Sequence, residues 1–125
     1  MKIATIIIRS LLGLAFVVFG LNVFYSFLPM PKTTPPPLAA DFGKALMSTH
    51  YMWVVACFEV VGGFLLLIGR FIGLGLVMLG AVIVNILCFH IFLDPSGLVM
   101  AIPVAVMGLF LLVVYHKSFA SLFNP

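Results

Sequence analysis

A carboxylate inside an apolar segment is the most chemically informative feature of this sequence. Glu59 lies near the centre of residues 51–69, a stretch of 19 residues with no other charged side chain. Placing a carboxylate at the middle of a hydrocarbon layer costs at least ~2.5 kcal/mol, so such residues usually face a bundle interior and hold a partner or a proton. Glu59 is therefore the first candidate for a functional residue.

Arg9 is the predicted partner of this carboxylate. At 1.5 Å per residue, Arg9 lies ~9 Å from one end of its helix, and Glu59 lies ~15 Å from the same end of the bundle. An arginine side chain spans much of that difference, so we predict a buried ion pair, direct or through water. Such a pair either only fixes the helix register or serves a ligand or a proton.

Three further polar residues, Asn22, Asn85 and His90, lie toward the opposite end of the helices. With Glu59 they are predicted to line a pocket for a quinone head group or another small ligand. Glu59 and His90 are then the candidates for catalytic proton transfer, since histidine titrates near neutral pH. In the alternative interpretation, the asparagines form hydrogen bonds between helices and His90 is an ordinary interfacial residue.

The cysteines suggest a second kind of chemistry. Cys57 and Cys88 each lie ~8–10 Å from that same end by residue count, which makes them candidates for a redox pair across two helices. Cysteine in an apolar segment also serves simply as a small hydrophobic residue. No histidine or cysteine pair has the spacing of a zinc or haem motif. We therefore predict no metal site, and no cofactor other than a bound quinone or lipid.

Composition identifies the elements that must position these residues. Of 125 residues, 65% are hydrophobic and 7% are charged, against about 25% charged in soluble domains. The six basic residues are scattered, which excludes a nucleic-acid surface. With ~20 residues per membrane span, we expect spans at about 3–28, 51–69, 71–93 and 98–115.

Turn-forming residues delimit these spans. Prolines 29, 31 and 35–37 end the first span because proline lacks an N–H donor. The chain is expected to reverse at Gly69-Arg70 and again at residues 94–97. The predicted fold is an all-α integral membrane four-helix bundle, a single domain over residues 1–125. A proline-rich loop and a short interfacial helix at 38–48 lie between its first two spans.

Small residues and charges indicate how the bundle packs and orients. Gly13 and Gly20 share a helix face with Arg9, and Ala56 and Gly63 share one with Glu59, so we expect both faces to point into the protein. The basic residues expected at one end are Lys2, Arg9, Arg70 and Lys117, and those at the other are Lys32 and Lys44. By the positive-inside rule both termini are then cytoplasmic, in a bacterial inner membrane.

Several segments of the chain resemble the DoxX family of small four-helix membrane proteins. The matching segments are RSLLGL at 9–14, FG at 19–20, EVVGG at 59–63, LIGR at 67–70, and NILCFHIFLDP at 85–95. The family takes its name from subunits of a thiosulfate:quinone oxidoreductase, and other members are linked to sulfur, thiol or oxidative-stress chemistry. By this resemblance, Arg9 and Glu59 match family positions.

The resemblance and the residues together support three functional hypotheses. The first is an accessory subunit of a membrane redox or energy-converting complex, next to quinone and without turnover of its own. The second is a quinone-linked membrane oxidoreductase component of sulfur or thiol metabolism. The third is a proton-coupled small-molecule transporter that uses Glu59. The expected partners are membrane lipids and other integral membrane subunits, with no nucleic acid.

Overall fold

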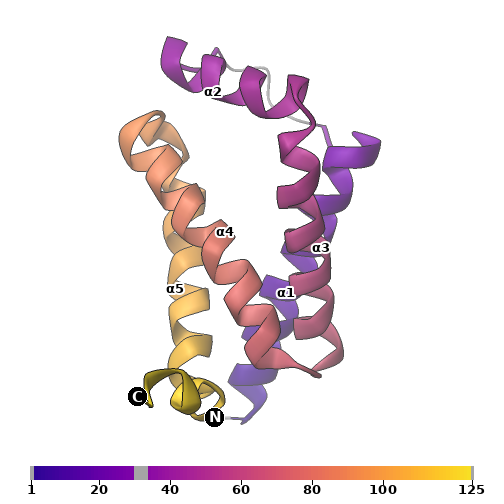
Figure 1. Cartoon of the computed structure of the whole chain (residues 1–125), viewed down its shortest axis with the longest axis vertical. Helices are drawn as coiled ribbons and strands as arrows, with labels where there is room; N and C mark the ends of the chain where they lie inside the picture. The colour runs from indigo at the N-terminus through magenta and orange to yellow at the C-terminus, as the bar shows by residue number, and fades with distance from the viewer. Residues whose placement is uncertain (1, 30–33, 125) are drawn as a thin grey trace.

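The structure, a computed structural model, describes residues 2–29 and 34–124, so Lys32 lies outside it. Four long helices run side by side along the molecule (Figure 1): α1 (Lys2–Tyr25), α3 (Tyr51–Ile68), α4 (Ile72–Phe92) and α5 (Leu98–Val114). Each of the four is long and apolar enough to cross a membrane, if the fourth span is counted from Pro95 and so includes the turn before α5. The predicted all-α membrane bundle is confirmed.

The connection between the first two spans contains the predicted short helix. α1 ends at Tyr25, earlier than expected, because the chain turns at Ser26, whose φ is 49°. The helix α2 (Pro37–Ser48) then lies across the end of the bundle (Figure 1). It begins with a proline, which suits the first helical turn because that N–H would have no partner. Phe42 of α2 packs on Phe89 of α4, with ring centroids 5.6 Å apart.

The reversal between α3 and α4 occurs at the predicted Gly69-Arg70. Gly69 has a φ of 69°, a conformation that glycine adopts without strain. The backbone N–H groups of Gly69 and Arg70 both donate to the carbonyl of Leu65, at 3.1 and 3.3 Å. These bonds satisfy a carbonyl that the end of the helix would otherwise leave without a partner.

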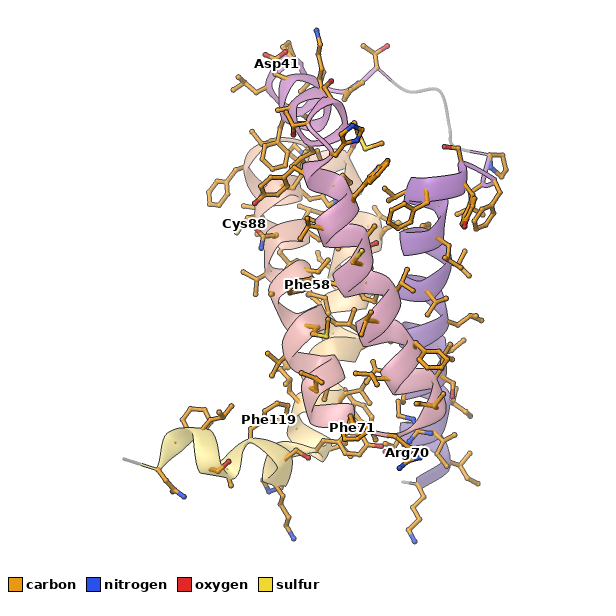
Figure 2. All side chains as sticks on the ribbon, turned by 45° about the vertical axis from the view of Figure 1, so that its right-hand side comes forward. Asp41, Phe58, Arg70, Phe71, Cys88 and Phe119 are labelled. Atoms are coloured by element: carbon orange, nitrogen blue, oxygen red, sulfur yellow. The ribbon has the colours of Figure 1, made fainter. Side chains whose placement is uncertain are left out.

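The start of α1 and the end of η2 (His116–Phe123) lie at the same end of the bundle (Figure 1). The turn between α3 and α4 is there too, and η2 runs sideways from the bundle (Figure 2). We call this the basic end, because it carries the side chains of Lys2, Arg70 and Lys117. The opposite end carries α2 and η1 (Pro95–Gly97), the short turn before α5.

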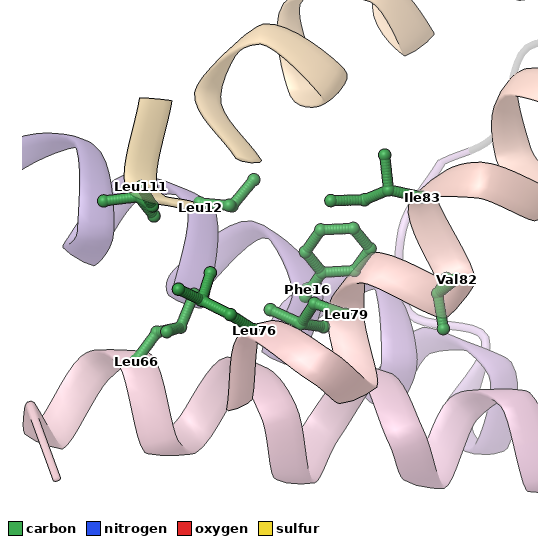
Figure 3. Packing of buried hydrophobic residues seen from close by; sticks show 8 residues of the cluster. All are labelled: Leu12, Phe16, Leu66, Leu76, Leu79, Val82, Ile83 and Leu111. Carbon is green, nitrogen blue, oxygen red and sulfur yellow. The ribbon is translucent and has the colours of Figure 1, made fainter. Parts of the chain in front are cut away.

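The core is small and joins all four spans. Its largest buried side chains come from α1, α3, α4 and α5 (Figure 3): Leu12, Phe16, Leu66, Leu76, Leu79, Val82, Ile83 and Leu111. Only 28% of the most apolar window of α1, α3 and α4 is buried, and 17% of that of α5. Most of the apolar surface of each helix therefore faces outward, as expected of spans surrounded by lipid.

Glycines bring α1 and α3 into backbone contact. A Cβ atom added to Gly13 would lie 2.6 Å from the carbonyl oxygen of Gly63, and one added to Gly63 would lie 2.6 Å from that of Gly13. Farther along, a Cβ on Gly20 would lie 3.0 Å from the carbonyl oxygen of Ala56. Close backbone approach through small residues is the usual way for membrane helices to pack. The predicted inward-facing stripes of α1 and α3 are confirmed.

Candidate functional site

Glu59 lies at the centre of α3 and faces into the bundle. It is eight residues from Tyr51 and nine from Ile68, which puts it ~12–13 Å from either end of the helix. The residue is 6% exposed, and its neighbour one turn earlier, Ala56, is 0% exposed. A Cβ on Gly20 of α1 would lie 3.1 Å from the Cβ of Glu59. The glycine contact between α1 and α3 therefore packs on the first side-chain carbon of Glu59.

Nothing in the described part of the chain neutralises this carboxylate. Within residues 2–29 and 34–124, the Glu59 side chain forms neither a hydrogen bond nor an ion pair, and its carboxyl oxygens are not among the fully enclosed polar atoms. A buried charge without a partner is strongly disfavoured in a low-dielectric medium. Glu59 is thus a group that gains from binding a proton or a cationic ligand.

The predicted ion pair between Arg9 and Glu59 is wrong. The guanidinium of Arg9 lies against Gly69, where an added Cβ would be 2.9 Å from Nη1 and 3.1 Å from Cζ. Gly69 follows Glu59 by ten residues, or ~15 Å along the helix. Because Gly13 contacts Gly63, it is Gly20, and not Arg9, that reaches the level of Glu59. The ion pair was predicted only from the length of the arginine side chain. The register of α1 on α3 places Arg9 too far from Glu59 for this pair to form.

Arg9 instead serves the end of α3. The last carbonyl groups of a helix carry a partial negative charge, and a guanidinium beside them is stabilising. The Nε atom of Arg9 is buried and has no hydrogen-bond partner among the described residues. The position of Arg9 therefore fits a role in holding the α3–α4 turn against α1.

The predicted pocket of Asn22, Asn85, His90 and Glu59 does not form. The side-chain oxygen of Asn22 accepts from the backbone N–H of Leu28 at 2.8 Å and closes the end of α1. Asn85 is exposed, and its Nδ2 donates to the Ala81 carbonyl at 2.8 Å. The asparagines thus bond within their own segments, and the alternative of hydrogen bonds between helices is wrong as well.

His90 belongs to the turn between α4 and α5. Its Nδ1 lies 3.0 Å from the carbonyl oxygen of Asp94, and its ring stands edge-on to that of Phe89 at 5.0 Å. The ring occupies the space that a Cβ on Gly97 would need.

The packing of α3 on α4 shows how far His90 lies from Glu59. Gly62 of α3 packs on Gly75 and Leu79 of α4, so in this antiparallel pair the level of Glu59 corresponds to residues near 80. His90 lies ~15 Å beyond that level.

Cys57 and Cys88 are both free and both exposed. Counted from the packing of Gly62 on residues 75–79, Cys57 lies level with residues near 82, and Cys88 lies ~9 Å farther along α4. The two thiols of the predicted redox pair are therefore on different levels of the outer surface. No group of three histidine, cysteine, aspartate or glutamate side chains in the described residues is arranged to hold a metal ion.

One feature that the residue types did not reveal is a groove between α4 and α5. This α4–α5 groove has a volume of about 710 Å³ and almost entirely apolar walls, which include Leu79, Ile83, Ala105 and Leu109. At the basic end it is bounded by η2 through His116 and Phe119. Its only signal in the sequence is a set of small residues that includes Gly80, and similar residues elsewhere in the chain mark close packing. A smaller recess of about 350 Å³ lies between α1 and α5, beside Lys2 and Tyr115.

Comparison of the chain with protein-family models, with curated proteins and with solved structures found no match. The resemblance to the DoxX family therefore stays a prediction from the quoted segments.

Proposed function

We propose that this chain is a DoxX-like accessory subunit of a membrane redox or energy-converting complex, and that Glu59 is the proton-accepting group it contributes. The observation that carries the proposal is the burial of residue Glu59 at mid-span, with no ion pair or hydrogen bond to its carboxyl in the described residues. Intramembrane carboxyls of this kind are costly and are typical of proton and ion pathways.

The surroundings of Glu59 favour a subunit over an independent enzyme. The polar residues that would have made a substrate pocket, Asn22, Asn85 and His90, are bonded to backbone groups of their own segments. The spans present mostly apolar surface, and their connections within the described residues are short or lie on the bundle end. A partner would therefore meet this chain within the bilayer, next to quinone if the complex uses one.

The charge distribution supports a location in a bacterial inner membrane with both termini cytoplasmic. Lys2, Arg9, Arg70 and Lys117 lie at or near the basic end, whereas Asp41 and Asp94 lie at the other (Figure 2 labels Arg70 and Asp41). An excess of lysine and arginine marks the cytoplasmic side of membrane proteins.

The test is purification from the native membrane in a mild detergent, followed by mass spectrometry of the co-purified proteins. We expect recovery at a fixed ratio with integral subunits of a redox or energy-converting complex. Glu59→Gln should keep this composition and lower the proton-linked activity of the complex, whereas Asp94→Asn, which changes an acid outside the spans, should leave it unchanged. Recovery of the chain alone as a homo-oligomer would contradict the proposal.

A proton-coupled transporter is the second candidate. It is favoured by the same lack of a counter-ion at Glu59, because a carboxyl that exchanges a proton for a cationic substrate must not be held by a fixed partner. The chain reconstituted alone in vesicles would then move a lipophilic cation against a pH gradient, and Glu59→Gln would stop this movement. The quinone-linked oxidoreductase has less support, because His90 lies far from Glu59 along the bundle.

A further inference from the structure

We propose that the two Nη groups of Arg9 hold the phosphate of an anionic phospholipid from the leaflet at the basic end, beside the turn between α3 and α4. This inference is independent of the proposed function, because Glu59 lies ~15 Å from this turn along α3. It depends on the unused hydrogen-bond donors of Arg9, on their depth in the bilayer, and on the distribution of charge along the bundle.

The guanidinium of Arg9 is a cation without a partner in the described part of the chain. Arginine has five N–H donors, and no described residue accepts a hydrogen bond from any of them. The Nε atom is enclosed by the protein, whereas Nη1 and Nη2 are not among the fully enclosed polar atoms. Two adjacent Nη groups form a planar fork that fits two oxygens of one phosphate.

The end of α3 positions this fork without using its donors. A Cβ added to Gly69 would lie 2.9 Å from Nη1 of Arg9 and 3.1 Å from Nη2, so the guanidinium packs directly on the turn. The Leu65 carbonyl at this helix end already accepts from the backbone N–H groups of Gly69 and Arg70. The turn therefore fixes the place of the guanidinium and leaves its open N–H groups for a ligand.

The fork lies at the depth of the lipid headgroups. The 18 residues of α3 extend over ~27 Å, and the hydrocarbon core of a bilayer is ~30 Å thick. Gly69 is the first residue after α3, and Arg70 and Phe71 follow it at the base of the bundle (Figure 2). A phosphate therefore reaches a side chain that packs on Gly69 without entering the hydrocarbon layer.

Charge complementarity selects an anionic headgroup. The three acidic side chains of the chain all lie away from the basic end, at mid-span or at the opposite end: Asp41, Glu59 and Asp94. Lys2, Arg70 and Lys117 add positive charge near Arg9, and no acidic side chain offsets it. Basic residues near a membrane surface attract anionic lipids, whereas a zwitterionic lipid would bring a further cation to this cluster.

The experiment is native mass spectrometry of the purified full chain with phosphatidylglycerol or phosphatidylcholine of identical acyl chains. We expect one phosphatidylglycerol to remain bound in preference to phosphatidylcholine. Arg9→Gln should lower the affinity for phosphatidylglycerol about tenfold or more, because it removes charge-assisted hydrogen bonds. Arg70→Gln is the matched control. It removes the same charge from the same end, and should lower the affinity no more than about fivefold.

Arg9→Lys separates the fork from the charge and from any loss of folding in Arg9→Gln, with circular dichroism as the check on helix content. It keeps the charge but not the planar fork, so its affinity should lie between those of the unaltered chain and Arg9→Gln. An affinity equal to that of the unaltered chain would overturn the proposal.

Three further outcomes would also overturn it. An equal loss in Arg9→Gln and Arg70→Gln would show attraction by net charge alone. Displacement of the lipid by an equimolar amount of glycerol phosphate would show a site for free phosphate. A co-purified protein that is lost from Arg9→Gln, with no lipid bound to the unaltered chain, would assign Arg9 to a carboxylate of that protein.

Discussion

The contact between α1 and α3 and the contact between α4 and α5 use the same small residues for opposite purposes. In the first, Gly13 and Gly63 let two backbones touch, and no room remains for even one methyl group. In the second, Gly80 faces open space in a groove of about 710 Å³. A glycine in a membrane helix therefore marks either a close contact between two backbones or an uncovered space, and the position of the neighbouring helix decides which. We call the close contact of α1 with α3 at Gly13 and Gly63 the seam.

The two contacts also differ in what they enclose. The α1–α3 contact includes Glu59, the most buried charged residue of the described chain, whose Cβ lies against Gly20. The α4–α5 contact encloses only apolar walls, with a histidine at the interface. The α1–α3 contact thus packs directly on the residue that carries the carboxylate, whereas the groove leaves apolar surface uncovered. Four substitutions test this comparison, in order of decreasing expected change in stability.

Gly63→Leu should abolish the α1–α3 seam. A side chain there would meet the Gly13 carbonyl oxygen and the backbone N of Val17, and a backbone cannot move aside as a flexible side chain does. We expect a loss of about 3 kcal/mol or more in the free energy of unfolding. The measurement is denaturation in detergent micelles followed by circular dichroism. Gly80→Leu is the matched control, and an equal loss in both variants would show that the seam and the groove do not differ.

Glu59→Met should stabilise the fold. The change replaces an unpartnered buried carboxyl with an apolar side chain of similar length, so we expect a gain of about 1–3 kcal/mol. Glu59→Gln should lie between the two. The same denaturation experiment measures the effect. A loss of stability in Glu59→Met would show that the carboxyl stabilises the seam through a partner.

Arg9→Met should weaken the seam where α3 ends. Removing the guanidinium from its place beside Gly69, at the end of α3, is expected to cost about 1 kcal/mol. Arg70→Met is the matched control, because Arg70 is exposed and its loss should cost less than about 0.5 kcal/mol. If both variants lose the same stability, the contact of Arg9 with Gly69 contributes nothing specific.

Gly80→Ala should have the smallest effect and a favourable sign. An added methyl group meets no atom within 4 Å, and alanine is better than glycine inside a helix by about 0.5–1 kcal/mol. Gly13→Ala, at a position where the methyl group would lie 2.6 Å from a carbonyl oxygen, should instead destabilise. Thermal unfolding of the two variants side by side gives the comparison, and effects of the same sign would contradict it.

Local patterns predicted the elements well. The spans, the reversal at Gly69-Arg70 and the short helix after the prolines follow from apolar length and from backbone preferences of glycine and proline, which act within a few residues. The inward faces of α1 and α3 were also predictable, since small residues recur there at helical spacing. The prediction for α1 was too long, because Ser26 turns the chain before the first proline.

The composition of the site was not predictable in the same way. Arg9 and Glu59 were paired by depth alone, but the register of α1 on α3 places them on different levels. Asn22, Asn85 and His90 shared an end of the bundle in the sequence, yet each found a backbone partner within six residues. A hydrogen bond to a nearby backbone group forms more readily than one to another helix, because it requires no alignment of two helices.

Four apolar helices with one carboxylate at mid-span follow from the amino-acid sequence, because hydrophobic length and the cost of a charge in hydrocarbon are local properties. The neighbours of that carboxylate depend instead on how the helices pack. Backbone contact at Gly13 and Gly63 sets the helix register, and this register places Gly20 beside Glu59 and Arg9 beside Gly69. The choice depends on the shapes of two helices together, which neither helix encodes alone.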